Sequence, residues 1–279
     1  MKVFISFDME GVGGVSSWRE TARGGKDFDR VRELATQEIN AVVEGVKKNG
    51  ENVEEILVAD SHSIGENLLI EELDTDISLV KGYPRPYYMM EGLNSSFDLV
   101  FFIGYHSGIG THSGGMDHTY SPSTIYELRI GGRPMGEAQI NAAYAGHFGV
   151  PVGLVSGDDR FVEQAKEAFG KEVETVVTKY GISRFASRNI HPQKVKELLR
   201  MGAQAAVKKA KGLKPYRIQP PLDVEIDLVS TLIGDLACLI PGVERVSGRQ
   251  MRFHPPDIPA LYRALMLIAT LGRLAKGIE

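Results

Sequence analysis

The fold is decided by the stretch Val3-Phe4-Ile5-Ser6-Phe7-Asp8-Met9-Glu10-Gly11, in which a short apolar run leads directly into two carboxylates. The apolar run predicts a buried strand. Side chains alternate along a strand, so Asp8 and Glu10 lie on one face, one pleat apart, if the extended backbone continues. Two carboxylates held that close repel each other unless a positive charge lies between them. Taken alone, the pattern is also typical of solvated loop acids, or of an aspartate that caps a turn.

The remainder of the first two-thirds of the chain alternates between strand and helix patterns. Residues 29–48 carry apolar side chains at helical spacing and are followed by the stop signal Asn49-Gly50, and residues 55–59 form the next apolar run. A strand, a helix and a strand within some 60 residues form a βαβ unit and hence a parallel sheet. We therefore predict an α/β fold with a mostly parallel sheet flanked by helices. Further strands are expected at 77–80, 99–103, 151–155 and 173–179, and helices at 137–148, after Asp158 or Asp159, and at 191–211.

A smaller C-terminal α+β region is expected after residues 214–221, which form the one linker-like segment with several prolines. It comprises a strand at 224–229, a short helix around Cys238 and a long final helix at 258–275. The predicted organisation is a metal-binding α/β catalytic domain at 1–213 and a strand-helix region at 214–279.

Candidate metal ligands follow the apolar runs. His62 and His106 come shortly after two of the expected strands, and Glu137 begins a helix after a hairpin turn at 129–134. Ligands in open α/β sheets gather at the carboxyl ends of the strands, so these side chains should converge with Asp8 and Glu10. Carboxylate oxygens and imidazole nitrogens suit zinc, manganese or cobalt. Five ligands, three of them carboxylates, suit a pair of ions, and such pairs lie about 3.5–4 Å apart and promote hydrolysis.

Other signals carry less information. The glycine-rich stretches 11–14 and 108–110 lack the spacing of a dinucleotide or phosphate loop, and there is no Gly-x-Ser-x-Gly elbow of a serine hydrolase. Asp60 is a candidate acceptor that orients the His62 imidazole, since metal-bound histidines usually need one. Arg129 and Lys179 are the basic residues considered for substrate anchoring.

Composition is that of an ordinary globular protein and narrows the class of partner. The net charge of −4 provides no basic footprint for nucleic acid. Cys238 is the only cysteine, which excludes an intrachain disulfide, and we expect it to be a buried small hydrophobe. We expect no signal peptide and no apolar stretch that approaches the roughly 20 residues of a membrane span. The prediction is a cytoplasmic protein that binds neither nucleic acid nor membrane.

The chain resembles the zinc D-aminopeptidases of the peptidase M55 family. The resemblance rests on an ordered set of short motifs that spans about the first two-thirds of the chain. These are Ser6-Phe7-Asp8-Met9-Glu10-Gly11, Asp60-Ser61-His62-Ser63, Met90-Glu91-Gly92-Leu93, Gly104-Tyr105-His106, His118-Thr119, Gly136-Glu137, Gly157-Asp158-Asp159-Arg160, Lys179 and Ile182-Ser183-Arg184. The last 60 or so residues match by length and not by motif.

The resemblance implies a role for each matched ligand. Asp8 is expected to bridge two zinc ions, with Glu10 and His106 completing one site and His62 and Glu137 the other. His118 corresponds to the catalytic histidine, near the metals and not bound to them. The implied activity is hydrolysis of N-terminal D-amino acids from short peptides, and the D preference comes from the resemblance alone. The resemblance also implies a homo-oligomer, in the form of a ring of ten subunits.

The chain departs from the family pattern in the loop between His106 and His118. His112 stands where a proline is expected, and an arginine expected shortly after His106 is absent. These departures concern the substrate pocket and leave the metal ligands intact.

Two other classes of function remain open at this point. A related metallo-amidase or phosphoesterase on the same scaffold would keep all five ligands and differ in its pocket. A non-catalytic binding protein would be marked by lost ligands, and none is lost here.

Overall fold

The computed structural model describes residues 1–48 and 52–278, so the expected helix stop at Asn49-Gly50 lies outside the described residues. A seven-stranded sheet, sheet A, has the order β3-β2-β1-β4-β7-β8-β9. Its neighbouring strands are parallel except for the antiparallel pair β8 and β9. The strands are β1 (Lys2–Phe7), β2 (Glu55–Asp60), β3 (Ile77–Val80), β4 (Leu99–Tyr105), β7 (Val152–Asp158), β8 (Glu174–Ser183) and β9 (Ala186–Asn189).

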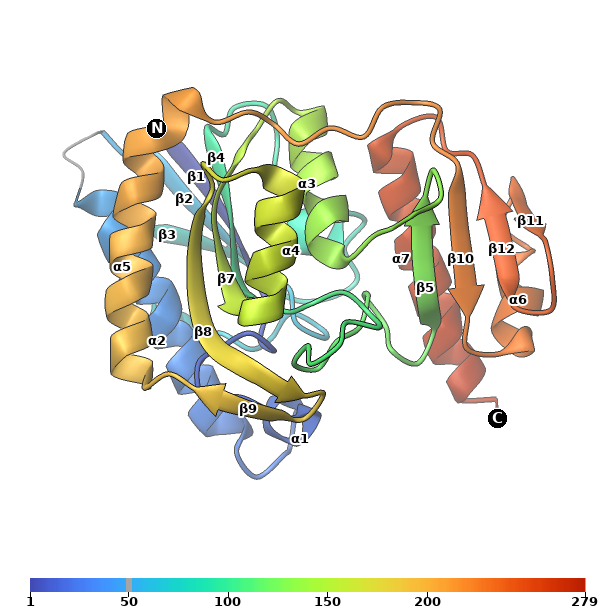
Figure 1. The fold of residues 1–279 in the computed structure, drawn as a ribbon, viewed down its shortest axis with the longest axis horizontal. Helices are drawn as coiled ribbons and strands as arrows, with labels where there is room; N and C mark the ends of the chain where they lie inside the picture. The colour runs from blue at the N-terminus through green and yellow to red at the C-terminus, as the bar shows by residue number, and fades with distance from the viewer. Residues whose placement is uncertain (49–51, 279) are drawn as a thin grey trace.

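Helices cover both faces of sheet A, which is why its central strands are apolar on both faces (Figure 1). Val3, Ile5 and Phe7 of β1 belong to the cluster formed with α2 (Phe28–Lys47) and α5 (Pro192–Lys209). Phe4 points to the other face, where α3 (Glu137–His147) and α4 (Asp159–Phe169) pack. Short helices lie at α1 (Trp18–Thr21), Ile70–Glu72, Tyr88–Met90 and Ala210–Gly212.

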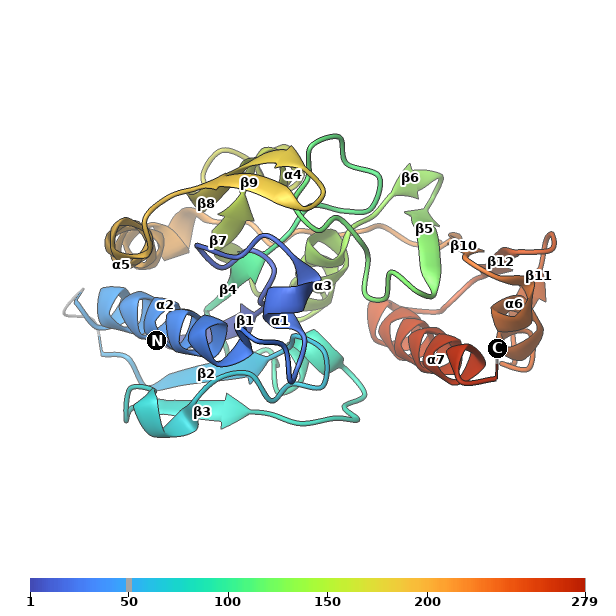
Figure 2. The same cartoon turned by 90° about the horizontal axis from the view of Figure 1, so that it is seen from below.

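A second sheet, sheet B, is antiparallel and has the order β11-β12-β10-β5-β6. It lies beside sheet A, with helix α7 (Ile258–Lys276) between them in the view from below (Figure 2). Its elements are β5 (Ile125–Ile130), β6 (Arg133–Pro134), β10 (Val224–Leu228), α6 (Thr231–Ala237), β11 (Val243–Arg245) and β12 (Gln250–Phe253). Because β5 pairs with β10, residues 125–134 join the C-terminal segment in one sheet. The division of the chain at 213/214 stays a prediction.

The α/β class and the mostly parallel sheet are confirmed, and so is the N-terminal cap of α4, where Asp158 accepts from the amides of Arg160 and Phe161. Around β5, only the hairpin turn at 129–134 was predicted. Strands β9, β11 and β12 were not predicted. Each has only three or four residues, and Ala186–Asn189 is mostly polar, so no alternation marks it.

The expectation that no apolar stretch approaches a membrane span was wrong for α7. This helix has 19 residues and a mean hydropathy of 1.3, so by length and composition alone it could cross a membrane. Leu261, Tyr262, Leu265 and Ile268 of α7 are buried in the core shared with sheet B, and this packing accounts for the apolar composition.

Candidate metal centre

The expected ligands meet at the carboxyl edge of sheet A. Asp8 and Glu10 follow β1, His62 follows β2 by two residues and His106 follows β4 directly. Glu137 is the first residue of α3. Parallel strands end at the same edge, and the topology therefore brings together ligands that are up to 129 positions apart in the sequence (8 to 137). The three carboxylates and His106 are buried, at 3–6% exposure.

The backbone at this edge is tightly packed. The Asp8 amide donates to the carbonyl of Ile103 at 2.8 Å, and the Gly11 amide donates to the carbonyl of Gly104 at 2.7 Å. Gly104 has a φ of +74°, and a Cβ there would lie 2.1 Å from the carbonyl oxygen of Asp8. Only glycine therefore permits the approach of β4 to the segment that carries Asp8.

Asp8 lies between two histidines and offers one oxygen to each. Its Oδ1 is 3.4 Å from Nδ1 of His62, and its Oδ2 is 3.4 Å from Nε2 of His106. Nδ1 of His62 also lies 3.0 Å from Oε2 of Glu10, and Nε2 of His106 lies 3.2 Å from Oε1 of Glu137. A carboxylate in this central position is placed as a bridging ligand would be.

Nε2 of His106 is the atom that most clearly fits a metal ligand. Its Nδ1 donates to the carbonyl of Ser107 at 2.9 Å, which leaves Nε2 as the free nitrogen. Nε2 is buried, lacks a hydrogen bond and faces the carboxylates of Asp8 and Glu137. Burial opposes protonation, but these carboxylates raise the pKa of His106 to about 10. The nitrogen is therefore placed to hold a positive centre, and a metal ion fits this set of oxygen and nitrogen donors.

The buried carboxylates Asp8 and Glu10 repel each other, and their pKa values shift in opposite directions. Burial, followed by the charge of Glu10, raises the pKa of Asp8 to about 7. Burial acts in the same direction on Glu10, yet His62, His118 and His106 together hold the pKa of Glu10 well below its usual range. Among the described residues, Asp8–Glu10–His106 and His106–His118–Glu137 form two groups whose ligand atoms lie within 4.8 Å of one another.

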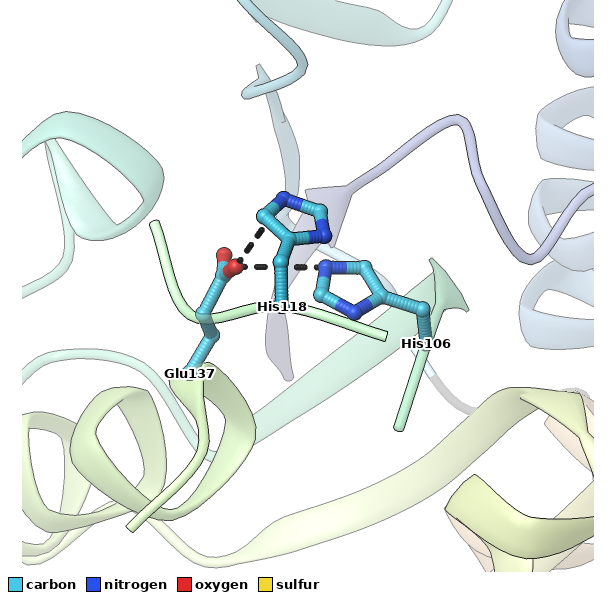
Figure 3. Close-up of side chains that lie close together, drawn as sticks. All are labelled: His106, His118 and Glu137. Carbon is cyan, nitrogen blue, oxygen red and sulfur yellow. Dashed lines mark ion pairs between the residues drawn. The ribbon is translucent and has the colours of Figure 1, made fainter. Parts of the chain in front are cut away.

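His118 stacks on His106, with ring centroids 4.0 Å apart and planes 9° from parallel (Figure 3). Its Nδ1 donates to the carbonyl of Met116 at 2.9 Å, and its Nε2 lies 3.6 Å from Oε1 of Glu137. Burial and the neighbouring His106 lower the pKa of His118. The ring is therefore neutral near pH 7, with Nε2 as the nitrogen free to accept a proton.

The loop that carries His118 is fixed by the turn between β8 and β9. Nε of Arg184 lies 3.1 Å from Oδ1 of Asp117, and its guanidinium also donates to the carbonyl of Asp117 at 3.0 Å. The Met116 amide donates to the carbonyl of Arg184 at 2.7 Å. The Arg184 guanidinium lies 5.0 Å over the ring of Trp18, whose edge meets His118. Arg184 and Trp18 thus hold the position of the histidine.

A cavity of about 640 Å³ is lined by His118 and by four of the five ligands, Asp8, Glu10, His62 and Glu137. Its walls come from α1, the loop at 120–123 and the last turns of α7. Sequence reasoning missed Trp18, Tyr88, Tyr120, Arg273 and Lys276, which line this cavity. The spacing of Arg273 and Lys276 on one helix face was visible in the sequence, but their position beside the metal ligands depends on how α7 packs.

Several secondary expectations were wrong. The Asp60 carboxylate accepts from the amides of Asn67 and Leu68 and from the Asn67 side chain, so it fixes the loop after β2 and does not orient the His62 ring. Arg129 pairs with acidic residues of sheet B. Lys179 is buried and donates to the carbonyls of Glu10, Val12 and Val15. Neither basic residue lines the cavity.

His112 is exposed, with its ring nitrogen 3.3 Å from the hydroxyl of Ser113. It does not line the cavity that contains the metal ligands. The histidine that departs from the family pattern is thus directed away from the candidate site.

Comparison with known proteins agrees with this geometry. The family model of the peptidase M55 group, described as D-aminopeptidase, matches residues 1–267. A D-aminopeptidase of Bacillus subtilis (strain 168) is 33% identical over 276 residues, which cover 98% of each chain. A solved structure, described as a zinc-dependent D-aminopeptidase DppA from Bacillus subtilis and a self-compartmentalizing protease, superposes with a TM-score of 0.93 at 32% identity and 98% coverage of each chain. The chain therefore belongs to the peptidase M55 family of D-aminopeptidases.

Proposed function

We propose that the protein is a zinc-dependent aminopeptidase that releases N-terminal D-amino acids from short peptides, with two ions per chain. Family membership supports the reaction class, and the related solved structure is described as zinc-dependent. The observation that carries the metal site is the buried Nε2 of His106, which faces two carboxylates without a hydrogen bond.

The ligand set consists of Asp8, Glu10, His62, His106 and Glu137, with Asp8 as the bridge. Its two oxygens face two different histidines, which supports the bridging role. The family resemblance implies that Glu10 and His106 hold one ion and that His62 and Glu137 hold the other. The distances support a different division, because His62 lies 3.0 Å from Glu10 and His106 lies 3.2 Å from Glu137. When bound, the ions would lower the pKa of a water toward neutrality and polarise the scissile carbonyl.

The protein's own groups supply the proton transfer. Nδ1 of His118 donates its proton to the Met116 carbonyl. The other ring nitrogen, Nε2, therefore faces Glu137. A neutral imidazole in this position can take a proton from the attacking water, return it to the leaving amine, or stabilise the developing oxyanion. The stacked His106 and the edge of Trp18 restrict the His118 ring to this orientation.

We also propose that the protein forms a homo-oligomer and works in the cytoplasm. The solved relative is described as a self-compartmentalizing protease, which supports assembly of several copies. Ile182 and Phe185 near the tip of the β8–β9 hairpin are exposed apolar side chains of the kind that such an assembly covers. The ring of ten subunits is a prediction from the family resemblance.

A metal and substrate assay tests the proposed function. Purified protein should contain close to two zinc ions per chain, and it should hydrolyse D-alanyl peptides in preference to their L counterparts and to phosphate esters. Removal of the metal with a chelator should abolish hydrolysis, and added zinc should restore it. Full activity at well below one ion per chain would contradict the dinuclear site, while turnover of phosphate esters alone would favour the phosphoesterase.

A further inference from the structure

The last turns of α7 bring two basic side chains to the cavity that contains the metal ligands. Arg273 and Lys276 are three positions apart and so share one face of the helix. Both are exposed and line the cavity, whereas Asp8, Glu10 and Glu137 are buried on its wall. The cavity therefore has a deep acidic end and a basic mouth.

Among residues 1–48 and 52–278, neither Arg273 nor Lys276 has a carboxylate within ion-pair distance. The guanidinium of Arg273 lies 5.0 Å above the ring of Tyr83. Tyr83 is itself held by a 2.5 Å hydrogen bond between its hydroxyl and that of Thr270 on α7. The stacked ring orients the guanidinium while its N–H donors stay available.

Tyr88 connects the two ends of the cavity electrostatically. It lines the cavity, and its hydroxyl donates to the carbonyl of Ser63 at 2.8 Å. Burial is the largest cause of the raised pKa of Tyr88, the charges of Asp8 and Glu137 add to it, and the charge of Arg273 opposes it. Asp8, Glu137, Tyr88 and Arg273 all line the same cavity, so the acidic and basic ends belong to one binding space.

A short peptide has the complementary charges, an amine at one end and a carboxylate at the other. We propose that Arg273 and Lys276 bind the C-terminal carboxylate of the substrate, so that the enzyme selects short peptides with a free C-terminus. This inference rests on the proposed aminopeptidase function, which places the amine at the acidic end. A cavity of about 640 Å³ suits a ligand of such a size.

The test compares D-alanyl-D-alanine with its C-terminal amide in the zinc-loaded enzyme. For the wild-type enzyme we expect a lower KM for the free carboxylate. The double variant Arg273→Gln/Lys276→Gln should raise the KM for D-alanyl-D-alanine about ten-fold with little change in kcat, and leave the amide unchanged, because only the carboxylate loses its charge-assisted hydrogen bonds. Added salt should weaken the wild-type preference, since the basic pair is exposed.

A matched control removes a positive charge elsewhere on α7. Arg263 donates to the hydroxyl of Tyr87 at 2.6 Å and does not line the cavity. Arg263→Gln should therefore leave the ratio between the two substrates unchanged. An equal effect of Arg263→Gln and the double variant would show a general charge effect and overturn the inference.

A binding measurement provides a readout that does not depend on turnover. Calorimetric titration with a reduced-amide isostere of D-alanyl-D-alanine should give a Kd that is about ten-fold weaker in the double variant. Unchanged Kd and unchanged substrate ratio would refute the role of the basic pair while the aminopeptidase function stands. Absence of any D-aminoacyl hydrolysis by the wild-type enzyme would instead refute the proposed function.

Discussion

The carboxyl edge of sheet A and the exposed face of sheet B use the same kinds of charged residue in opposite ways. On sheet B, Arg129 lies 2.6 Å from Asp227 and 3.4 Å from Glu225, and Arg252 lies 2.5 Å from Glu225. At the edge of sheet A, the ion-pair partners of buried Asp8 and Glu137 among the described residues are all histidines.

The difference separates a structural array of charges from a functional one. On sheet B, Arg129 and Arg252 are paired with anions, and partly exposed pairs of this kind contribute little to stability. At the edge of sheet A three carboxylates crowd around imidazoles in a buried site, an arrangement that costs free energy until a cation arrives. Buried carboxylates that repel one another therefore mark the place where the protein binds a cation.

The largest expected effect is that of Asp8→Ala. The change removes the ligand that faces both histidines, so the variant should lose more zinc than His62→Ala and retain almost no activity. The loss of metal affinity should exceed the 10–100-fold that is typical for removal of a residue outside the ligand set. Metal content after dialysis against a series of chelator concentrations measures the loss of zinc affinity in each variant.

Arg129→Ala is the comparison on sheet B. It breaks the contacts to Glu225 and Asp227, yet it should leave zinc content and turnover near those of the wild type. Equal zinc losses for Asp8→Ala and His62→Ala would count against a bridge.

His118→Ala should separate chemistry from metal binding at the edge of sheet A. His118 is stacked on a ligand and is placed to move a proton, so its loss should lower kcat by about two to four orders of magnitude. Both ions and the fold should be retained, which metal analysis and thermal unfolding would verify.

His112→Ala is the matched control in the same loop, because the His112 side chain is exposed and outside the cavity. It should change kcat by far less. A severe loss with His112→Ala and none with His118→Ala would mean that the wrong histidine has been assigned. A fall in bound zinc with His118→Ala would make that residue a ligand, as its grouping with His106 and Glu137 also allows.

Sheet A was predictable from the sequence because its signals are local. Apart from the polar edge strand β9, its strands contain apolar runs. The carboxyl ends of its parallel strands meet by topology, so the position of a ligand after a run is enough to place it at the edge. The six site residues named from the sequence do converge in the structure.

Sheet B and the outer wall of the cavity were harder to predict. Strands of three or four residues carry too short a pattern, and the pairing of β5 with β10 joins residues that are 94 to 103 positions apart (130 with 224, 125 with 228). Trp18, Arg273 and Lys276 reach the cavity through the packing of α1 and α7, for which no short motif exists. The prediction for Asp60 was wrong for another reason. Its position near His62 suggested that it orients the imidazole, whereas its carboxylate accepts hydrogen bonds from the amides of Asn67 and Leu68.

The smallest expected effect contrasts two glutamates by the pH dependence of stability. Glu38 on α2 is 1% exposed and accepts from the Gly13 amide at 2.8 Å, while its second oxygen has no partner. Burial raises the pKa of Glu38 from 4.5 to about 7, against the opposing effects of Gly13 and Lys179. Between these two pH values the folded protein retains a proton that the unfolded chain has released. The free energy of unfolding therefore falls as pH rises through this window, by about 3 kcal/mol at 1.36 kcal/mol per pH unit.

Glu225 on sheet B should behave in the opposite way. Its hydrogen bonds to Arg252 and Arg129 lower the pKa of Glu225, so its contribution to stability is present above pH 4.5 and is lost as pH falls through the folded value. Urea unfolding with chelator present, at pH 4, 5.5 and 7, measures the contributions of Glu38 and Glu225 to the free energy of unfolding. Glu38→Gln should flatten the decline between pH 4.5 and 7, because glutamine keeps an acceptor for Gly13 and does not titrate. Glu225→Gln should leave that decline intact and remove only the acid-side loss. Identical slopes in Glu38→Gln and the wild type would mean that Glu38 is ionised in the folded protein, with Lys179 as its compensating charge.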